Sequence, residues 1–235
     1  MELLVLAYVA VAVSFTVSAA AGFGGSLVLV PALALVLGTK EGIALAALLL
    51  AGNNVAKVGA YRRSLPFRRS AVLLVLIALG SLAGASLLVA TPAEVVTTAV
   101  LVSFAAAFAV ERSSWSALRP SGAWALALGA GLTSGFSGTS GPLKGLAVRN
   151  LALDRAHLVG CMSLLSLFGD ATKAAVFAGA GLLPSGAALV AGAVPLMLGC
   201  TWLGRRWNGA IGERGYTTLF WSVMAGYTLR LATSL

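Results

Sequence analysis

The chain has little charge and few of the side chains with which soluble enzymes carry out chemistry. Only 10% of its 235 residues are charged, whereas a soluble domain carries about 25%. With two cysteines and one histidine, the sequence excludes a disulfide scaffold, and neither a metal site nor a cofactor is expected. Because 59% of the residues are hydrophobic, the composition also excludes a soluble globule and a disordered chain.

Hydrophobic runs fill nearly the whole sequence. A helix needs roughly 20 apolar residues to cross a bilayer. Runs of about this length lie at 3–21, 43–61, 70–90, 93–110, 121–135, 156–178, 185–204 and 215–233. We therefore predict an all-α polytopic membrane protein with no separate soluble domain. The first run lacks the basic n-region of a signal peptide and is expected to be retained.

Two shorter runs, 26–37 and 142–153, each follow a segment that disfavours helix. Twelve residues of helix extend only about 18 Å, against a bilayer core of roughly 30 Å. The preceding segments contain Gly22, Phe23, Gly24 and Gly25 in the first half and Ser137, Gly138, Thr139, Ser140, Gly141 and Pro142 in the second. Since glycine and proline are poor helix formers, we predict that a helix stops and restarts within the membrane at 22–25 and at 135–142.

The arginines predict the orientation of the spans. Eleven of the 16 basic residues lie in four loops that one threading places together on the cytoplasmic side: Arg62, Arg63, Arg68, Arg69, Arg112, Arg119, Arg149, Arg155, Arg205, Arg206 and Arg214. Both chain termini then lie outside the cytoplasm. The predicted location of the protein is the inner membrane of a bacterium or archaeon. This distribution accounts for the net charge of +9, so nucleic acid is not expected as a partner.

A shift of 116 residues brings the two halves of the sequence into register. Two pairs of glycines and one pair of lysines then coincide: Gly22 with Gly138, Gly25 with Gly141, and Lys57 with Lys173. Each half, 1–116 and 117–235, is predicted to be a broken hairpin followed by three spans, so the second half must be inverted. Inverted repeats with broken helices are typical of secondary transporters, which bind substrate near the bilayer midplane.

Each half also contains a glycine-rich turn followed by an apolar stretch. In the first half the turn 22–25 leads to Val30-Pro31, and Tyr61-Arg62-Arg63 follows in a basic loop. In the second half the turn is 137–142, and Ala147 stands where Pro31 stands in the first. With these motifs the chain resembles the TauE/SafE family of sulfite exporters and organosulfonate permeases. The resemblance implies transport of a small sulfur oxyanion, coupled to protons.

The two breaks are the first candidates for an anion site. A helix terminus inside the membrane offers N–H donors and the positive end of the helix dipole, and glycine allows the backbone to approach an anion closely. Ser26, Ser137, Thr139 and Ser140 add hydroxyl donors. The alternative is close helix packing, for which membrane proteins also use small residues.

Polar residues within the spans are the second group of candidates. Asn53, Asn54 and Asp170 lie deep, and Asp170 is a candidate carrier of a coupling proton or, alternatively, the partner of Lys173 three residues later. Lys57 and Lys173 are candidate attractors of an anion, one near each membrane face. Their alternative is to snorkel to the interface without a function. Lys144 and Arg149 are weaker candidates on the inner side.

These features predict a secondary transporter, not an enzyme, that moves sulfite, an organosulfonate or a related anion by alternating access. Transport of another small carboxylate or of a neutral solute remains an alternative. A more remote alternative is an intramembrane serine protease, with Ser137 in a Gly-x-Ser-Gly pattern and His157 as the base. The expected partners are a small anionic substrate and the lipid bilayer, and a homo-oligomer stays open.

Overall fold

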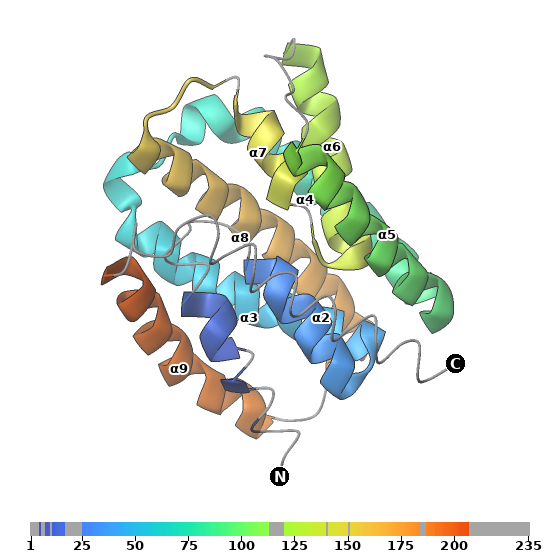
Figure 1. Ribbon diagram of the computed structural model, residues 1–235. Helices are drawn as coiled ribbons and strands as arrows, with labels where there is room; N and C mark the ends of the chain where they lie inside the picture. Colours follow the sequence, from blue (N-terminus) through green and yellow to red (C-terminus); the bar gives the residue numbers. More distant parts are fainter. Residues whose placement is uncertain are drawn as a thin grey trace.

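The computed structural model describes residues 5, 8–9, 11–16, 25–112, 120–139, 141–149, 151–183 and 187–206. These residues form helices and connections, with no strand among them. The elements are α2 (Gly25–Leu37), α3 (Thr39–Ala60), the 3-10 helix η1 (Arg62–Ser64), α4 (Phe67–Ala90), α5 (Ala93–Arg112), α6 (Pro120–Ser137), α7 (Gly141–Arg149), α8 (Arg155–Gly179) and α9 (Ala187–Arg206). The predicted all-helical class is confirmed (Figure 1).

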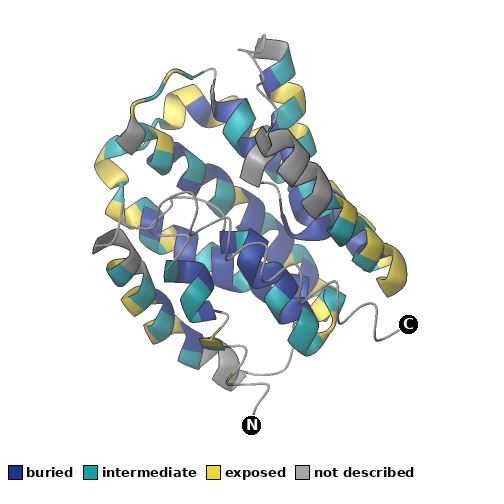
Figure 2. Ribbon diagram, in the orientation of Figure 1, coloured by how far each residue is buried: buried dark blue, intermediate teal, exposed yellow. Residues whose placement is uncertain are grey.

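Three of these helices are long and apolar enough to cross a membrane: α3, α4 and the part His157–Gly179 of α8. Helix α4 is apolar on both faces. Leu73, Leu74 and Ile77 are buried, whereas Val75 and Leu79 are more than half exposed. A helix with apolar residues all round is stable between a protein interior and lipid tails, not between a protein interior and water. Figure 2 shows this alternation of buried and exposed segments along the helices.

The second break lies within the predicted segment 135–142 but is shorter, because residues 135–137 belong to α6 and residues 141–142 to α7. Helix α6 ends at Ser137, Gly138 has a φ of 80°, and α7 begins at Gly141. With only nine residues, α7 extends about 13 Å and cannot cross a bilayer. The predicted run 142–153 is too long, because the chain leaves the helix at Arg149 and Asp154 caps the next helix.

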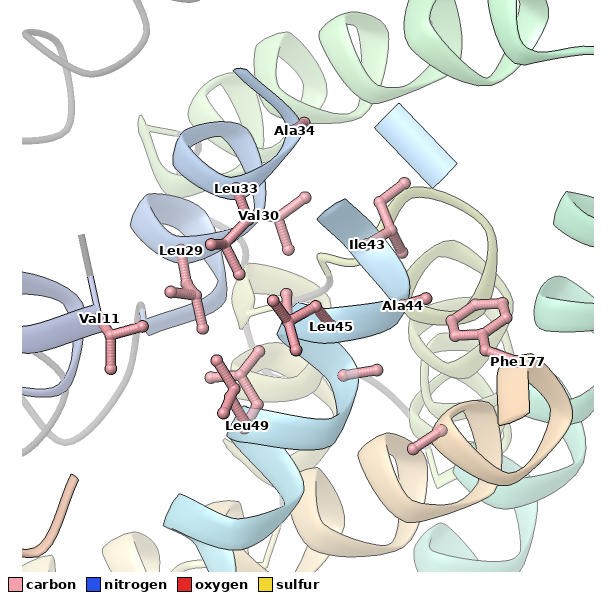
Figure 3. Close-up of a cluster of buried hydrophobic side chains, with 14 of the residues drawn as sticks. Val11, Leu29, Val30, Leu33, Ala34, Ile43, Ala44, Leu45, Leu49 and Phe177 are labelled. Atoms are coloured by element: carbon pink, nitrogen blue, oxygen red, sulfur yellow. The ribbon is translucent and has the colours of Figure 1, made fainter. Parts of the chain in front are cut away.

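The first break is described in part. Helix α2 begins at Gly25 and continues through Pro31 to Leu37. Gly22, Phe23 and Gly24 lie outside the described residues. The 13-residue α2 matches the predicted short run 26–37 and packs against α3 in a large apolar cluster (Figure 3).

Helices α3 and α8 are counterparts in the sequence repeat, and they pack against each other. Their first residues, Thr39 and Arg155, are 116 positions apart. Gly160, near the start of α8, packs against Ser64, just beyond the end of α3. At the other end Figure 3 shows Phe177 of α8 beside Ala44 of α3. The two helices therefore run in opposite directions.

Helices α4 and α6 approach each other through glycines. Gly80 and Gly84 on α4 face Gly131 and Gly135 on α6, and a Cβ at any of the four would collide with backbone atoms of the other helix. Both pairs have the Gly-x-x-x-Gly spacing that allows transmembrane helices to pack backbone against backbone. This contact holds the helix that ends at the second break firmly against α4.

Candidate functional site

Four charged side chains are buried in the part of the protein that the structure describes. Lys57 lies on α3, Lys144 on α7, and Asp170 and Lys173 on α8. Their exposed fractions are 7%, 5%, 4% and 1%, respectively. Three ammonium groups thus share the interior with one carboxylate. Ionisable groups at this depth are costly to bury and point to a function.

Asp170 is the centre of this cluster. Its Oδ1 lies 2.8 Å from the Nζ of Lys173, and its Oδ2 accepts a hydrogen bond of 2.8 Å from the Nδ2 of Asn54. The pairing of Asp170 with Lys173, which the sequence left as an alternative, is therefore present. The carboxylate also attracts the ammonium groups of Lys57 and Lys144.

Asn54 and Asp170 are counterparts in the two halves. They stand 116 residues apart, the same separation as the glycine pairs, and their side chains are in direct contact. Asn53, the preceding residue on α3, is fully buried. The contact between antiparallel helices thus occurs at equivalent positions of the repeat.

Lys173 also reaches the second break. Its Nζ lies 3.1 Å from the Ser134 Oγ and 3.5 Å from the carbonyl oxygens of Ser134 and Gly138. Carbonyl oxygens at a helix C-terminus carry partial negative charge and attract cations. This side of the break therefore binds a lysine, which the predicted role of the break as a source of N–H donors did not include.

Lys144 brings α7 into the same cluster. Its Nζ lies 3.4 Å from the Ser166 Oγ on α8, and it experiences the charges of both Asp170 and Lys173. With three lysines and one aspartate, the buried side chains of the described residues have a formal charge of +2 when all four are ionised. An excess of this kind suits an anion of one or two charges.

The burial of Lys57 and Lys173 bears on one of the two roles predicted for them, because it speaks against snorkelling to the interface. Lys57 and Lys173 were expected near opposite membrane faces and, alternatively, snorkelling to the interface. Both are buried, and both interact with the single carboxylate of Asp170. Each lysine lies three residues beyond the Asn54–Asp170 contact on its own helix, and α3 and α8 run in opposite directions, so the expected placement toward opposite membrane faces stays a prediction.

The hydroxyl candidates have different surroundings. Ser137 is fully buried and donates from Oγ to the Thr133 carbonyl oxygen at 2.8 Å, within its own helix. Thr139 is 3% exposed, and Ser26 is partly exposed on the first turn of α2. Ser140 lies outside the described residues, and Gly141 is described only as the first residue of α7.

The second break packs against α2, the helix that follows the first break. A Cβ at Gly138 would lie 2.8 Å from the Val30 Cγ2 on α2. The Gly25 carbonyl oxygen accepts a 2.7 Å hydrogen bond from the Ser14 Oγ. Since Gly138 also has a positive φ, a side chain at this position would be strained for two separate reasons.

Two polar contacts of the cluster were missed from the sequence: Ser134 and Ser166. A signal for Ser134 exists, because Ser18 stands 116 residues earlier and precedes Gly22 as Ser134 precedes Gly138. Ser166 has Leu50 as its counterpart, so the repeat gives no sign of it.

The geometry of the described residues gives little support to the alternative functions. Ser137 is bonded to Thr133, whereas the Nδ1 of His157 pairs with Asp154 at 2.7 Å near the protein surface. The two proposed protease residues thus have separate partners. Among the described residues no three His, Cys, Asp or Glu side chains gather in a way that could hold a metal ion.

A comparison with protein families gives one result that covers nearly the whole chain. Residues 6–231 match the family described as sulfite exporter TauE/SafE. Comparisons with curated proteins and with solved structures give no match. The match includes both halves, both predicted breaks and the buried lysine cluster. The chain therefore belongs to the TauE/SafE sulfite exporter family and is a membrane transporter by family.

Proposed function

We propose that the protein is a secondary transporter for a small oxyanion, sulfite or an organosulfonate, and that the anion binds at Lys57 and Lys144. The observation that carries this proposal is the formal charge of +2 in the buried cluster. An anion between these ammonium groups would balance their charge where water is scarce and electrostatic attraction is strong. Family membership gives sulfite as the first substrate to test.

Lys173 has a different role in this proposal. Its contacts with Asp170, Ser134 and Gly138 join α8 to the end of α6. It therefore holds the second break in place beside the anion, and the anion itself contacts Lys57 and Lys144.

Asp170 is the proposed carrier of the coupling proton. It is the one acidic side chain buried among the described residues, and it interacts with all three lysines. Loss of the negative charge of Asp170 would change the formal charge of the cluster by one unit. Proton binding and anion binding would then be linked through the same group.

The proposed movement is a rocking of two inverted halves around this cluster. The antiparallel course of α3 and α8 supports the inversion, and the contact of Asn54 with Asp170 marks where the halves meet. We place the protein in a bacterial or archaeal inner membrane with both termini outside, from the arginine distribution. Substrates would then alternate between the two sides of one site.

The test is solute flux into proteoliposomes in which the full chain is reconstituted. Sulfite, an alkanesulfonate, sulfate, acetate and a neutral sugar are compared with and without a pH gradient. We expect sulfite or sulfonate flux well above that of empty liposomes. Flux for the carboxylate or the sugar alone would favour the alternative substrates, and no flux above empty liposomes for any solute would overturn the proposal.

A matched pair of variants tests the site. Lys144→Gln removes a buried charge from the cluster. Lys40→Gln removes a lysine outside the cluster, whose Nζ donates a 3.1 Å hydrogen bond to the Val89 carbonyl oxygen. We expect Lys144→Gln to lower flux at least about tenfold and Lys40→Gln to leave it close to wild type. Equal flux in the two variants would remove Lys144 from the site.

A further inference from the structure

One cavity lies apart from the lysine cluster. It has a volume of about 510 Å³ and is lined by two segments, one at the start of α4 and one at the start of α8. The lining residues are Leu65, Pro66, Phe67, Arg68, Arg69, Ala152, Leu153, Asp154 and His157. His157 precedes Asp170 by 13 residues on α8, which places the cavity roughly 20 Å from the cluster along that helix. The connection between α7 and α8, at the upper left of Figure 1, forms one wall.

The polar part of this cavity is basic. Arg68 and Arg69 are exposed, and guanidinium groups match the oxygens of a phosphate in paired hydrogen bonds. The one acidic residue of the lining, Asp154, is engaged by α8 itself: its Oδ1 accepts from the His157 backbone N–H at 2.9 Å, and its Oδ2 lies 2.7 Å from the His157 Nδ1. Arg68 and Arg69 thus bring two positive charges to an exposed part of the lining, beside the single carboxylate of Asp154.

The other part of the cavity is apolar, and it lies beside the first turns of two helices that are long and apolar enough to cross a membrane. Leu65, Pro66 and Leu153 line it, and Phe67 is half exposed at its edge. Both α4 and α8 are helices that can cross a bilayer, and the cavity lies at their first turns. A free inorganic anion would use only the arginines, whereas a phospholipid headgroup would use the arginines and the apolar wall together.

We propose that this cavity binds the phosphate headgroup of an anionic phospholipid. Basic pockets between transmembrane helices at the membrane surface are suited to such headgroups. The bound lipid would join the α3–α4 connection to the α7–α8 connection, which belong to different halves of the sequence repeat. This proposal does not depend on the identity of the transported solute.

The test is lipid binding to the full chain in detergent, measured by native mass spectrometry with phosphatidylglycerol and with phosphatidylcholine. Arg68→Gln/Arg69→Gln is compared with Arg62→Gln/Arg63→Gln, which removes the same charge from equally exposed arginines of the same loop that do not line the cavity. We expect the first pair to weaken phosphatidylglycerol binding about thirtyfold and the second less than about threefold. Leu153→Trp, which fills the cavity and keeps every charge, should weaken it as the first pair does.

Three outcomes would overturn the proposal. Equal losses in the two arginine pairs would show general attraction between a basic loop and anionic lipid. Equal binding of phosphatidylcholine would remove the headgroup preference. Displacement of phosphatidylglycerol by inorganic phosphate at the same concentration would show that the cavity prefers a free anion.

Discussion

At the scale of single residues, the contacts of Asp170 decide what the lysines can do. Both of its oxygens have partners, from two helices. A buried ion pair contributes little net stability, but removal of one partner leaves the other charge buried and uncompensated. After such a change the Lys173 ammonium group would keep only uncharged oxygens among its described contacts: the Ser134 hydroxyl and the carbonyl oxygens of Ser134 and Gly138.

We therefore predict an asymmetric double-mutant cycle at this pair. Asp170→Asn should lower the free energy of unfolding by about 3 kcal/mol. Asp170→Asn/Lys173→Met should lower it less than that single change, because the remaining charge is also removed. Thermal unfolding of the purified protein in detergent compares Asp170→Asn, Lys173→Met and the double variant with wild type. Additive losses in the double variant would contradict this account of the pair.

The same carboxylate leads to a prediction about coupling. If Asp170 carries the proton, Asp170→Asn should abolish the effect of a pH gradient on anion flux, because an amide does not titrate in this range. Flux driven by the anion gradient alone in proteoliposomes is the reference for each variant. A pH-gradient effect of wild-type size in Asp170→Asn would assign the coupling to another group.

The sequence predicted most members of this cluster, but not their arrangement. Asn54, Asp170 and Lys173 stand out as polar residues in apolar runs, and the spacing of Asp170 and Lys173 is that of neighbours on a helix. Lys144 was ranked low because it lies, with Arg149, on the short helix that follows the second break. Only the packing of α7 against α8 shows that its side chain is buried.

At the scale of elements, the glycines of α4 and α6 determine how closely these helices pack. A Cβ at Gly135 would lie 2.5 Å from the Ser81 carbonyl oxygen and 2.6 Å from the Ala85 nitrogen. The three nearest atoms are all backbone atoms of α4, so no side chain can move away to make room for the Cβ. Gly129, on the same helix, has nothing within 4 Å of such a Cβ.

We predict opposite effects for the same substitution at these two positions. Gly135→Ala should destabilise the protein by about 1–3 kcal/mol through overpacking. Gly129→Ala should be neutral or stabilise it by up to about 1 kcal/mol, because alanine is the better helix former. Thermal unfolding in detergent compares the two, and similar midpoints would show that α4 and α6 are not in close contact.

The breaks were predictable at this scale because glycine and proline act locally on a helix. The close contact of α4 with α6 was not predicted, although Gly80, Gly84, Gly131 and Gly135 carry the spacing for it. In a chain with 28 glycines many such spacings occur, and which two meet is decided by tertiary packing.

At the scale of the whole molecule, the predicted inversion has a direct consequence for the positions of the loops. The segment around Arg68, between α3 and α4, and the segment around Arg205, at the end of α9, should lie on the same side of the membrane. Glu94, at the start of α5, should lie on the other side because α4 crosses between Arg68 and Glu94.

Single cysteines test this arrangement in intact cells, after Cys161 and Cys200 are replaced by alanine. Arg68→Cys and Arg205→Cys should be protected from a membrane-impermeant thiol reagent, and Glu94→Cys should react. Permeabilised cells, in which all three should react, provide the control. Reaction of Arg68→Cys and protection of Arg205→Cys, or the reverse, would contradict the two-halves arrangement.

The meeting of Asn54 with Asp170 has one more implication. A residue on an approximate two-fold axis touches its own counterpart, so two identical halves would place an acid against an acid or an amide against an amide there. An amide opposite a carboxylate requires that the two halves differ at this point, as they do in this chain. The difference between the halves thus places one carboxylate at this contact instead of two that would repel each other.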